Sequence, residues 1–176
     1  GTVNSFFIGF TATFIATTLG TLAALGLSRP HMPYKGLIMA ILISPMIVPL
    51  IITAAGMFFF YARINLVYTF TGVILAHVAL ATPFVVITVT ATLVGFDMNM
   101  VKASQSLGAR PVRTFFKVIM PLILPGVISG ALFAFITSFD EVVIVMFMAS
   151  LDQLTIPKQM WAGIRQEISP VILCMA

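Results

Sequence analysis

The segment VKASQSLGARPVRTFFKVIMP, residues 101–121, places basic side chains around a single glycine in a chain that is otherwise strongly apolar. The glycine is Gly108, and the basic residues are Lys102, Arg110, Arg113 and Lys117. The segment therefore interrupts the apolar pattern with a basic helix, a glycine and a second basic helix.

Local signals predict two short helices here. Asp97 is a suitable N-cap for a helix that runs to about Leu107, and Gly108 can take the left-handed conformation that ends it. A second helix can begin at Pro111, because its missing N–H costs nothing in a first turn. Apolar residues then recur at positions 112, 115, 116 and 119, the spacing of one helical face. We expect a helical elbow, residues 97–120, with one apolar side.

The composition places the chain in a bilayer. Of its 176 residues, 60% are hydrophobic and 8% are charged, and the mean hydropathy is +1.15. Soluble domains carry about 25% charged residues, so this chain has too few to build a water-facing shell. The net charge of +4 is concentrated in short connections, which favours membrane topology over nucleic-acid binding. Cys174, the single cysteine, allows neither a disulfide framework nor a thiolate metal site.

Uncharged windows long enough to cross a hydrocarbon core about 30 Å thick follow one another along the chain. They are residues 1–28, 36–62, 64–96 and 118–139, and a further window begins near residue 168 and is cut short. Open strands would leave backbone groups unpaired in lipid, so the windows predict helices. The expected fold is an all-α membrane protein with about four complete transmembrane helices and a truncated fifth, in a single domain over residues 1–176.

Small residues and prolines indicate how these helices are shaped. Pro45, Pro49 and Pro83 lie inside apolar windows and predict kinks, since each removes a backbone hydrogen bond. Gly126 and Gly130 predict a close approach of two helix backbones.

Lysine and arginine are distributed unequally between the connections, which indicates orientation in the membrane. If each window crosses once, Arg29 and Lys35 lie on the same side as the basic residues of the elbow. The opposite side holds Arg63, Lys158 and Arg165. Six basic residues against three place the elbow in the cytoplasm.

Two roles are open for such an elbow. Its apolar side is suited to a groove on another protein, since helix-in-groove docking is a common mode. The alternative is a basic amphipathic loop resting on anionic lipid headgroups.

The spacing of Ala103, Gly108 and Pro121 fits the pattern E-A-A, three residues, G, nine residues, I-x-L-P. Here the segment resembles the cytoplasmic EAA loop of ABC importer permeases, the binding-protein-dependent transport family. Lys102 replaces the usual glutamate and Ser104 the second alanine. In the family this loop is a coupling helix seated in a cleft of the ATPase subunit. The resemblance therefore implies these ATPase-coupling residues: Lys102, Ala103, Ser104, Leu107, Gly108, Ala109, Arg110 and Pro121.

Four further stretches resemble the spermidine/putrescine branch of these permeases. They are GTLAALGLSR (residues 20–29), LAHVALATPFVV (75–86), LPGVISGALFAFITSFDEVV (124–143) and MWAGIRQEISP (160–170). The resemblance implies a type I ABC importer transmembrane domain in the bacterial inner membrane. It also implies the import of a small solute by alternating access, and the expected solute is a polyamine. Implied partners are a cytoplasmic ATP-binding subunit dimer, a second permease subunit, the same or a sister, and an external substrate-binding protein. The first helix and most of the last are expected to be missing.

Asp140 and Glu141 lie between two apolar runs. Ionisable groups near the membrane interior usually face a partner or a wet cavity, so the pair is a candidate pathway site for a cation, with Trp161 as a possible cation–π partner. Neighbours on a helix point about 100° apart, so at most one carboxylate should face the pathway. The alternative is that the pair caps a helix or pairs with Lys158 or Arg165 at the outer interface.

His77 is expected to hydrogen-bond between helices rather than to relay protons, and no second histidine or carboxylate shares its window, which argues against a metal site.

The sequence has no G-x-x-x-x-G-K-[ST] motif, so we expect a transport subunit with no cofactor, whose ATP hydrolysis takes place on a partner chain. A secondary transporter without an ATPase is the first rival, but the first three windows contain no carboxylate for a coupling ion. An intramembrane enzyme is the second, and no HExxH or G-x-S-x-G motif supports it.

Overall fold

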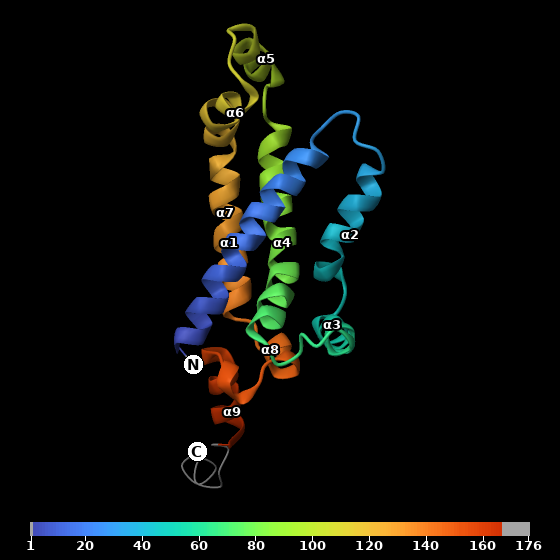
Figure 1. Cartoon of the computed structure of the whole chain (residues 1–176), viewed down its shortest axis with the longest axis vertical. Coiled ribbons are helices and arrows are strands. Elements are labelled where there is room, and N and C mark those ends of the chain that lie inside the picture. The colour runs from blue at the N-terminus through green and yellow to red at the C-terminus, as the bar shows by residue number, and fades with distance from the viewer. Residues whose placement is uncertain (1, 167–176) are drawn as a thin grey trace, which may run out of the picture.

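The computed structural model describes residues 2–166, in which long helices pack side by side and short helices cover both ends (Figure 1). The central bundle consists of α1 (Thr2–Leu27), α4 (Phe70–Val94) and α7 (Met120–Phe139), which pack against one another. In the described part, three helices are long and apolar enough to cross a membrane: Thr2–Leu27, Phe70–Val94 and a continuous helix over Pro111–Phe139. The predicted spans at residues 1–28, 64–96 and 118–139 are therefore confirmed as helices.

The second window departs from the prediction of one spanning helix with kinks. It forms α2 (Lys35–Ile47) and α3 (Leu50–Arg63), whose axes differ by 107°. The break follows from Pro49, because the residue before a proline is driven to extended backbone, and Val48 has ψ 135°. Pro45, by contrast, lies inside α2 without ending it. Neither helix alone is long enough to cross a membrane, but the two together are long and apolar enough to form one broken span.

The elbow forms where the sequence predicts it. Asp97 caps α5 (Met98–Ser106) by accepting a hydrogen bond from the backbone N–H of Asn99 at 2.9 Å. Gly108 has φ 79°, the left-handed conformation expected of it. Pro111 then begins α6 (Pro111–Thr114), which continues through a π-helical turn, η1 (Phe115–Ile119), into α7. The second arm of the elbow is thus the start of a spanning helix.

The opposite end holds the remaining short elements, α8 (Val143–Met148), η2 (Leu151–Gln153) and α9 (Ile156–Gln166). The first turns of α1 hold η2 and the start of α9 by hydrogen bonds. Asn4 Nδ2 donates to the carbonyl of Asp152 at 2.8 Å, and Ser5 Oγ accepts from the N–H of Ile156 at 2.7 Å. The truncated fifth window, from residue 168, lies outside the described residues.

Helix α4 is the centre of the bundle. In its most apolar window 67% of the residues are buried, against 33% for α1 and 22% for the Pro111–Phe139 helix. His77 of α4 is 1% exposed, and its Nδ1 lies 2.8 Å from Ser138 Oγ of α7, so the predicted hydrogen bond between helices is confirmed. The outward faces of α1 and α7 remain open for lipid or partners.

Glycines allow these helices to approach closely. A Cβ at Gly20 would lie 2.6 Å from Cβ of Val85, which is closer than side chains can pack. A Cβ at Gly130 would lie 2.9 Å from Cα of Val85, so α1 and α7 both press against the same turn of α4. The close approach predicted from Gly126 and Gly130 is confirmed.

We expect Gly130→Leu to lower the free energy of unfolding by about 1–3 kcal/mol, because α7 must move away from the backbone of α4. The measurement is denaturant unfolding in detergent micelles followed by circular dichroism. Gly26→Leu is the matched control, since a Cβ at Gly26 of α1 meets nothing within 4 Å. Equal stability of the two variants would contradict the packing argument.

Candidate functional site

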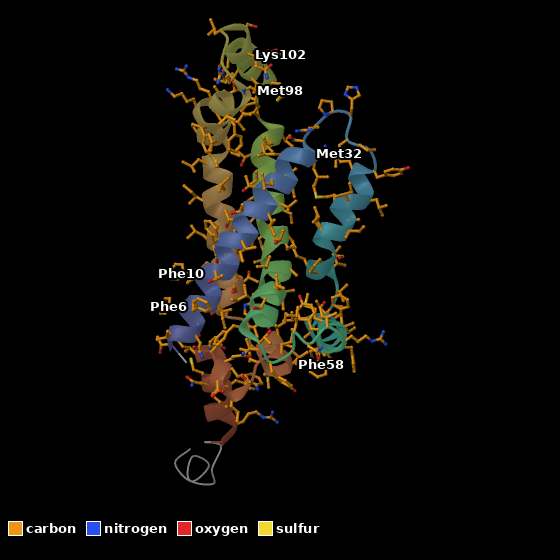
Figure 2. The ribbon with its side chains drawn as sticks, in the orientation of Figure 1. Phe6, Phe10, Met32, Phe58, Met98 and Lys102 are labelled. Atoms are coloured by element: carbon orange, nitrogen blue, oxygen red, sulfur yellow. The ribbon has the colours of Figure 1, made fainter. Side chains whose placement is uncertain are left out.

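The molecule has candidate sites at both ends of the bundle. Figure 2 shows Lys102 and Met98 of the elbow at the same end as Met32, in the connection between α1 and α2, whereas Phe58 of α3 lies at the other end. The two most basic connections therefore share one end, as the topology argument requires. The Asp140–Glu141 pair follows the last residue of α7, at the opposite end.

Backbone hydrogen bonds hold the bend of the elbow. The N–H of Gly108 donates to the carbonyl of Gln105 at 2.9 Å, and the N–H of Ala109 donates to the carbonyl of Ser104 at 3.1 Å. These bonds close the end of α5 and require the positive φ at Gly108. Leu107 stands at the tip, 89% exposed. An apolar side chain this exposed beside the bend is available to a partner surface.

A polar contact inside the elbow joins its two arms. Ser104 Oγ of α5 lies 3.1 Å from Thr114 Oγ1 at the end of α6, and Thr114 is 2% exposed. Because both hydroxyls can donate and accept, the contact satisfies a buried polar group and fixes the angle between the arms. Apart from the serine at position 104, no feature of the sequence predicts this pairing.

A hollow of about 530 Å³ opens on the concave side of the elbow. It is lined by Met100, Ala103, Ser104, Leu107, Gly108, Ala109, Arg113 and Val118. Five of the predicted coupling residues, those at positions 103, 104 and 107 to 109, are thus brought together. Lys102 and Arg110 are exposed on the elbow outside this lining, and Pro121 lies in α7.

The π-helical turn lies directly before Pro121. The N–H of Met120 donates to the carbonyl of Phe115, five residues back, and Pro121 has no N–H to continue the α-helical pattern. The π-helical turn contains one residue more than an α-helical turn, so the predicted apolar residues no longer lie on one face of the helix. Phe115 and Ile119 line a hollow against the ends of α1 and α4, whereas Val112 and Phe116 are 68% and 62% exposed. The expected single apolar side is therefore divided between two directions.

Glu141 lies in a second hollow, of about 190 Å³, where the α2–α3 break meets α4 and α7. Its other lining residues are Pro45, Met46, Leu50, Leu80, Phe84 and Thr137. Glu141 is 7% exposed, and its Oε1 accepts a hydrogen bond from the N–H of Ile144 at 3.0 Å, so it also caps α8. Glu141 is the second residue after the spanning helix, which ends at Phe139. Burial raises the pKa of Glu141 above its ordinary value, while hydrogen bonds from Ile144 and Val143 oppose that rise.

The structure separates the other two predicted pathway residues from Glu141. Asp140 is exposed at the C-cap of α7 and does not line the hollow that holds Glu141. Trp161 lies on α9 and lines a different hollow, with Lys158 and Arg165. Sequence reasoning missed Met46 and Phe84 as neighbours of Glu141, although Pro49 was a signal that the chain bends there.

Comparison with known proteins adds independent information. Residues 16–176 match the family described as "Binding-protein-dependent transport system inner membrane component". The spermidine/putrescine transport system permease protein PotC of Haemophilus influenzae is 31% identical over 174 residues, which cover 99% of this chain and 68% of the relative. PotC of Escherichia coli K12 is 30% identical over 167 residues, 95% of this chain and 63% of the relative. The putrescine transport system permease protein PotI of E. coli K12 is 34% identical over 102 residues, 58% of this chain and 36% of the relative.

We expect Ser104→Ala to loosen the elbow, because it leaves the buried Thr114 hydroxyl without its partner, at a cost of about 0.5–1.5 kcal/mol. Hydrogen exchange of the α5 amides, measured by mass spectrometry, should become about 2- to 10-fold faster. The double variant Ser104→Ala/Thr114→Val removes both polar groups and should recover part of the protection. Unchanged exchange in Ser104→Ala would exclude the contact as a support of the bend.

Proposed function

Because the chain belongs to the binding-protein-dependent transport system inner membrane component family, we propose that it acts as the permease subunit of an ATP-driven importer. In this role its elbow docks in a cleft of a cytoplasmic ATPase subunit, and its helix bundle forms part of a path for a small solute. ATP binding on the partner closes the ATPase dimer, and the elbow transmits that movement to α7. The path then alternates between the two sides of the membrane.

The observation that carries this proposal is the geometry of the elbow within a matching family. Its tip exposes Leu107, its hollow brings together the residues at positions 103, 104 and 107 to 109, and its second arm is the start of the spanning helix over Pro111–Phe139. A lipid-resting loop would need no such rigid connection. A secondary transporter would have no use for a docking element on the basic side of the membrane.

The chain spans 68% and 63% of the two PotC relatives, so the further subunits belong to the proposal. We propose a dimer of cytoplasmic ATP-binding subunits, a second permease subunit and an external substrate-binding protein. The second permease subunit completes the path, since the outward faces of α1 and α7 are left open in this chain.

We expect Gly108→Val to weaken co-purification of the ATPase subunit, because valine in a left-handed conformation is strained by about 1–2 kcal/mol. That energy corresponds to about 5- to 30-fold weaker association. Gly108→Asn is the control, since asparagine tolerates this conformation, and a Cβ at Gly108 meets nothing within 4 Å. Docking that survives Gly108→Val unchanged would remove the elbow from the proposed interface.

For the cargo, we propose a polyamine and the hollow beside Glu141 as a point of contact. The hollow combines one carboxylate with apolar walls from Met46, Leu80 and Phe84. An aliphatic ammonium is complementary to such a site, because its positive charge can face the carboxylate and its methylene groups can face the apolar walls. The names of the PotC and PotI relatives refer to spermidine and putrescine, which are aliphatic polyamines.

We expect Glu141→Gln to raise the half-saturating concentration for putrescine uptake by about 10- to 100-fold, because a hydrogen bond to a charged group contributes about 1.5–3 kcal/mol. The amide oxygen can still accept from the N–H of Ile144, so the cap of α8 remains. Asp140→Asn removes the same charge from an exposed position and should have little effect. Uptake by proteoliposomes that hold the assembled transporter is the measurement, and equal kinetics in both variants would refute the contact.

A further inference from the structure

The hollow that Trp161 lines, of about 320 Å³, lies between α8 and α9 at the end of the bundle opposite the elbow. Its lining consists of Met146, Lys158, Trp161, Ala162 and Arg165. All but Met146 come from α9, where their positions follow the i, i+3, i+4, i+7 spacing, so one face of this helix forms the wall. None of these residues lines the hollow beside Glu141.

The start of α9 is fixed at the level where α1 enters the membrane. Asn4 and Ser5, in the first turns of α1, hold Asp152 and Ile156 by hydrogen bonds of 2.8 and 2.7 Å. Helix α1 is long and apolar enough to cross a membrane, so its first turns lie at one end of that span, where hydrocarbon gives way to headgroups. The hollow therefore opens at the depth of the lipid headgroups.

The apolar side chains of α9 fit that depth. Met160, Trp161 and Ile164 are 63%, 50% and 59% exposed; Trp161 lines the hollow, and Met160 and Ile164 each adjoin a lining residue in the sequence. A helix with large apolar side chains on one side and cations next to them lies in the membrane interface. Tryptophan is enriched at this boundary, because its ring is apolar and its N–H is polar.

The two cations of the hollow can supply N–H donors to an anion. Lys158 Nζ donates to the carbonyls of Val145 and Ala149, at 3.2 and 3.4 Å, and an ammonium has a third donor. Burial lowers the pKa of Lys158, so a nearby negative charge would stabilise its charged form. Arg165 is exposed at the other end of the same face, and its planar fork suits phosphate oxygens.

We propose that this hollow binds the phosphate of an anionic phospholipid headgroup, between Lys158 and Arg165, with the acyl chains alongside Met160 and Ile164. The half-buried Lys158 and the exposed Arg165 flank the apolar residues of this face, which matches a charged headgroup joined to acyl chains. A docking surface for the acidic rim of a soluble protein would instead have polar residues around the two cations. The site is separate from the transport path and does not depend on the identity of the cargo.

The test uses Trp161, the only tryptophan of the chain, as the probe. The chain is reconstituted in phosphatidylcholine vesicles that contain either brominated phosphatidylglycerol or, in a matched background, brominated phosphatidylcholine. Quenching of Trp161 fluorescence then gives a relative association constant for the two lipids, which we expect to favour phosphatidylglycerol. Arg165→Gln should lower that preference about fivefold, because one cation near a membrane surface contributes about 1 kcal/mol.

Arg63→Gln is the control of equal charge, since Arg63 is exposed at the same end but on α3. It should leave the preference unchanged. Equal quenching by the two lipids would overturn the proposal. An equal loss of the preference for phosphatidylglycerol in Arg165→Gln and Arg63→Gln would also overturn it, because it would indicate an effect of general surface charge. Quenching that shows no lipid preference but disappears when the external binding protein is added would assign the hollow to protein docking instead.

Discussion

The close approach of α1 and α7 to one turn of α4, around Val85, is the constraint on which the rest of this structure depends. In lipid the apolar side chains of a helix gain little by facing another helix, so contact must come from tight packing. Gly20 and Gly130 provide it, because neither has a side chain to hold the backbones apart. With this contact in place, the ends of α4 and α7 stay in register at both membrane surfaces.

That register links the two candidate sites through a single element. The helix over Pro111–Phe139 begins inside the elbow and ends one residue before Asp140. Its 29 residues at about 1.5 Å per residue reach across the whole bilayer. Under the proposed function, a displacement of the elbow would be carried along this helix to the neighbourhood of Glu141. The π-helical turn is the one interruption of its regular pattern, and it lies on the elbow side.

Much of this arrangement could be predicted from the sequence because the signals are local or periodic. The N-cap at Asp97, the left-handed Gly108 and the helix start at Pro111 each depend on a few neighbouring residues, and all are confirmed. The 107° bend after α2 was missed, since the sequence marks Pro45 and Pro49 alike and only packing decides which one breaks the helix. For the same reason the neighbours of Glu141 could not be predicted, because they come from helices distant in sequence. The assignment of coupling and pathway residues stays a prediction.

Two departures of the elbow from the family pattern, at positions 102 and 104, differ in their physical consequences. Ser104 acts within the chain, because its hydroxyl contacts the buried Thr114 and thereby ties the two arms together. Lys102 is exposed, so the shape of the elbow does not require a particular charge there. The inverted charge at position 102 therefore concerns only what the elbow presents to its partner. If the proposed docking holds, the complementary change belongs on the ATPase surface, whereas the serine needs no change in any other subunit.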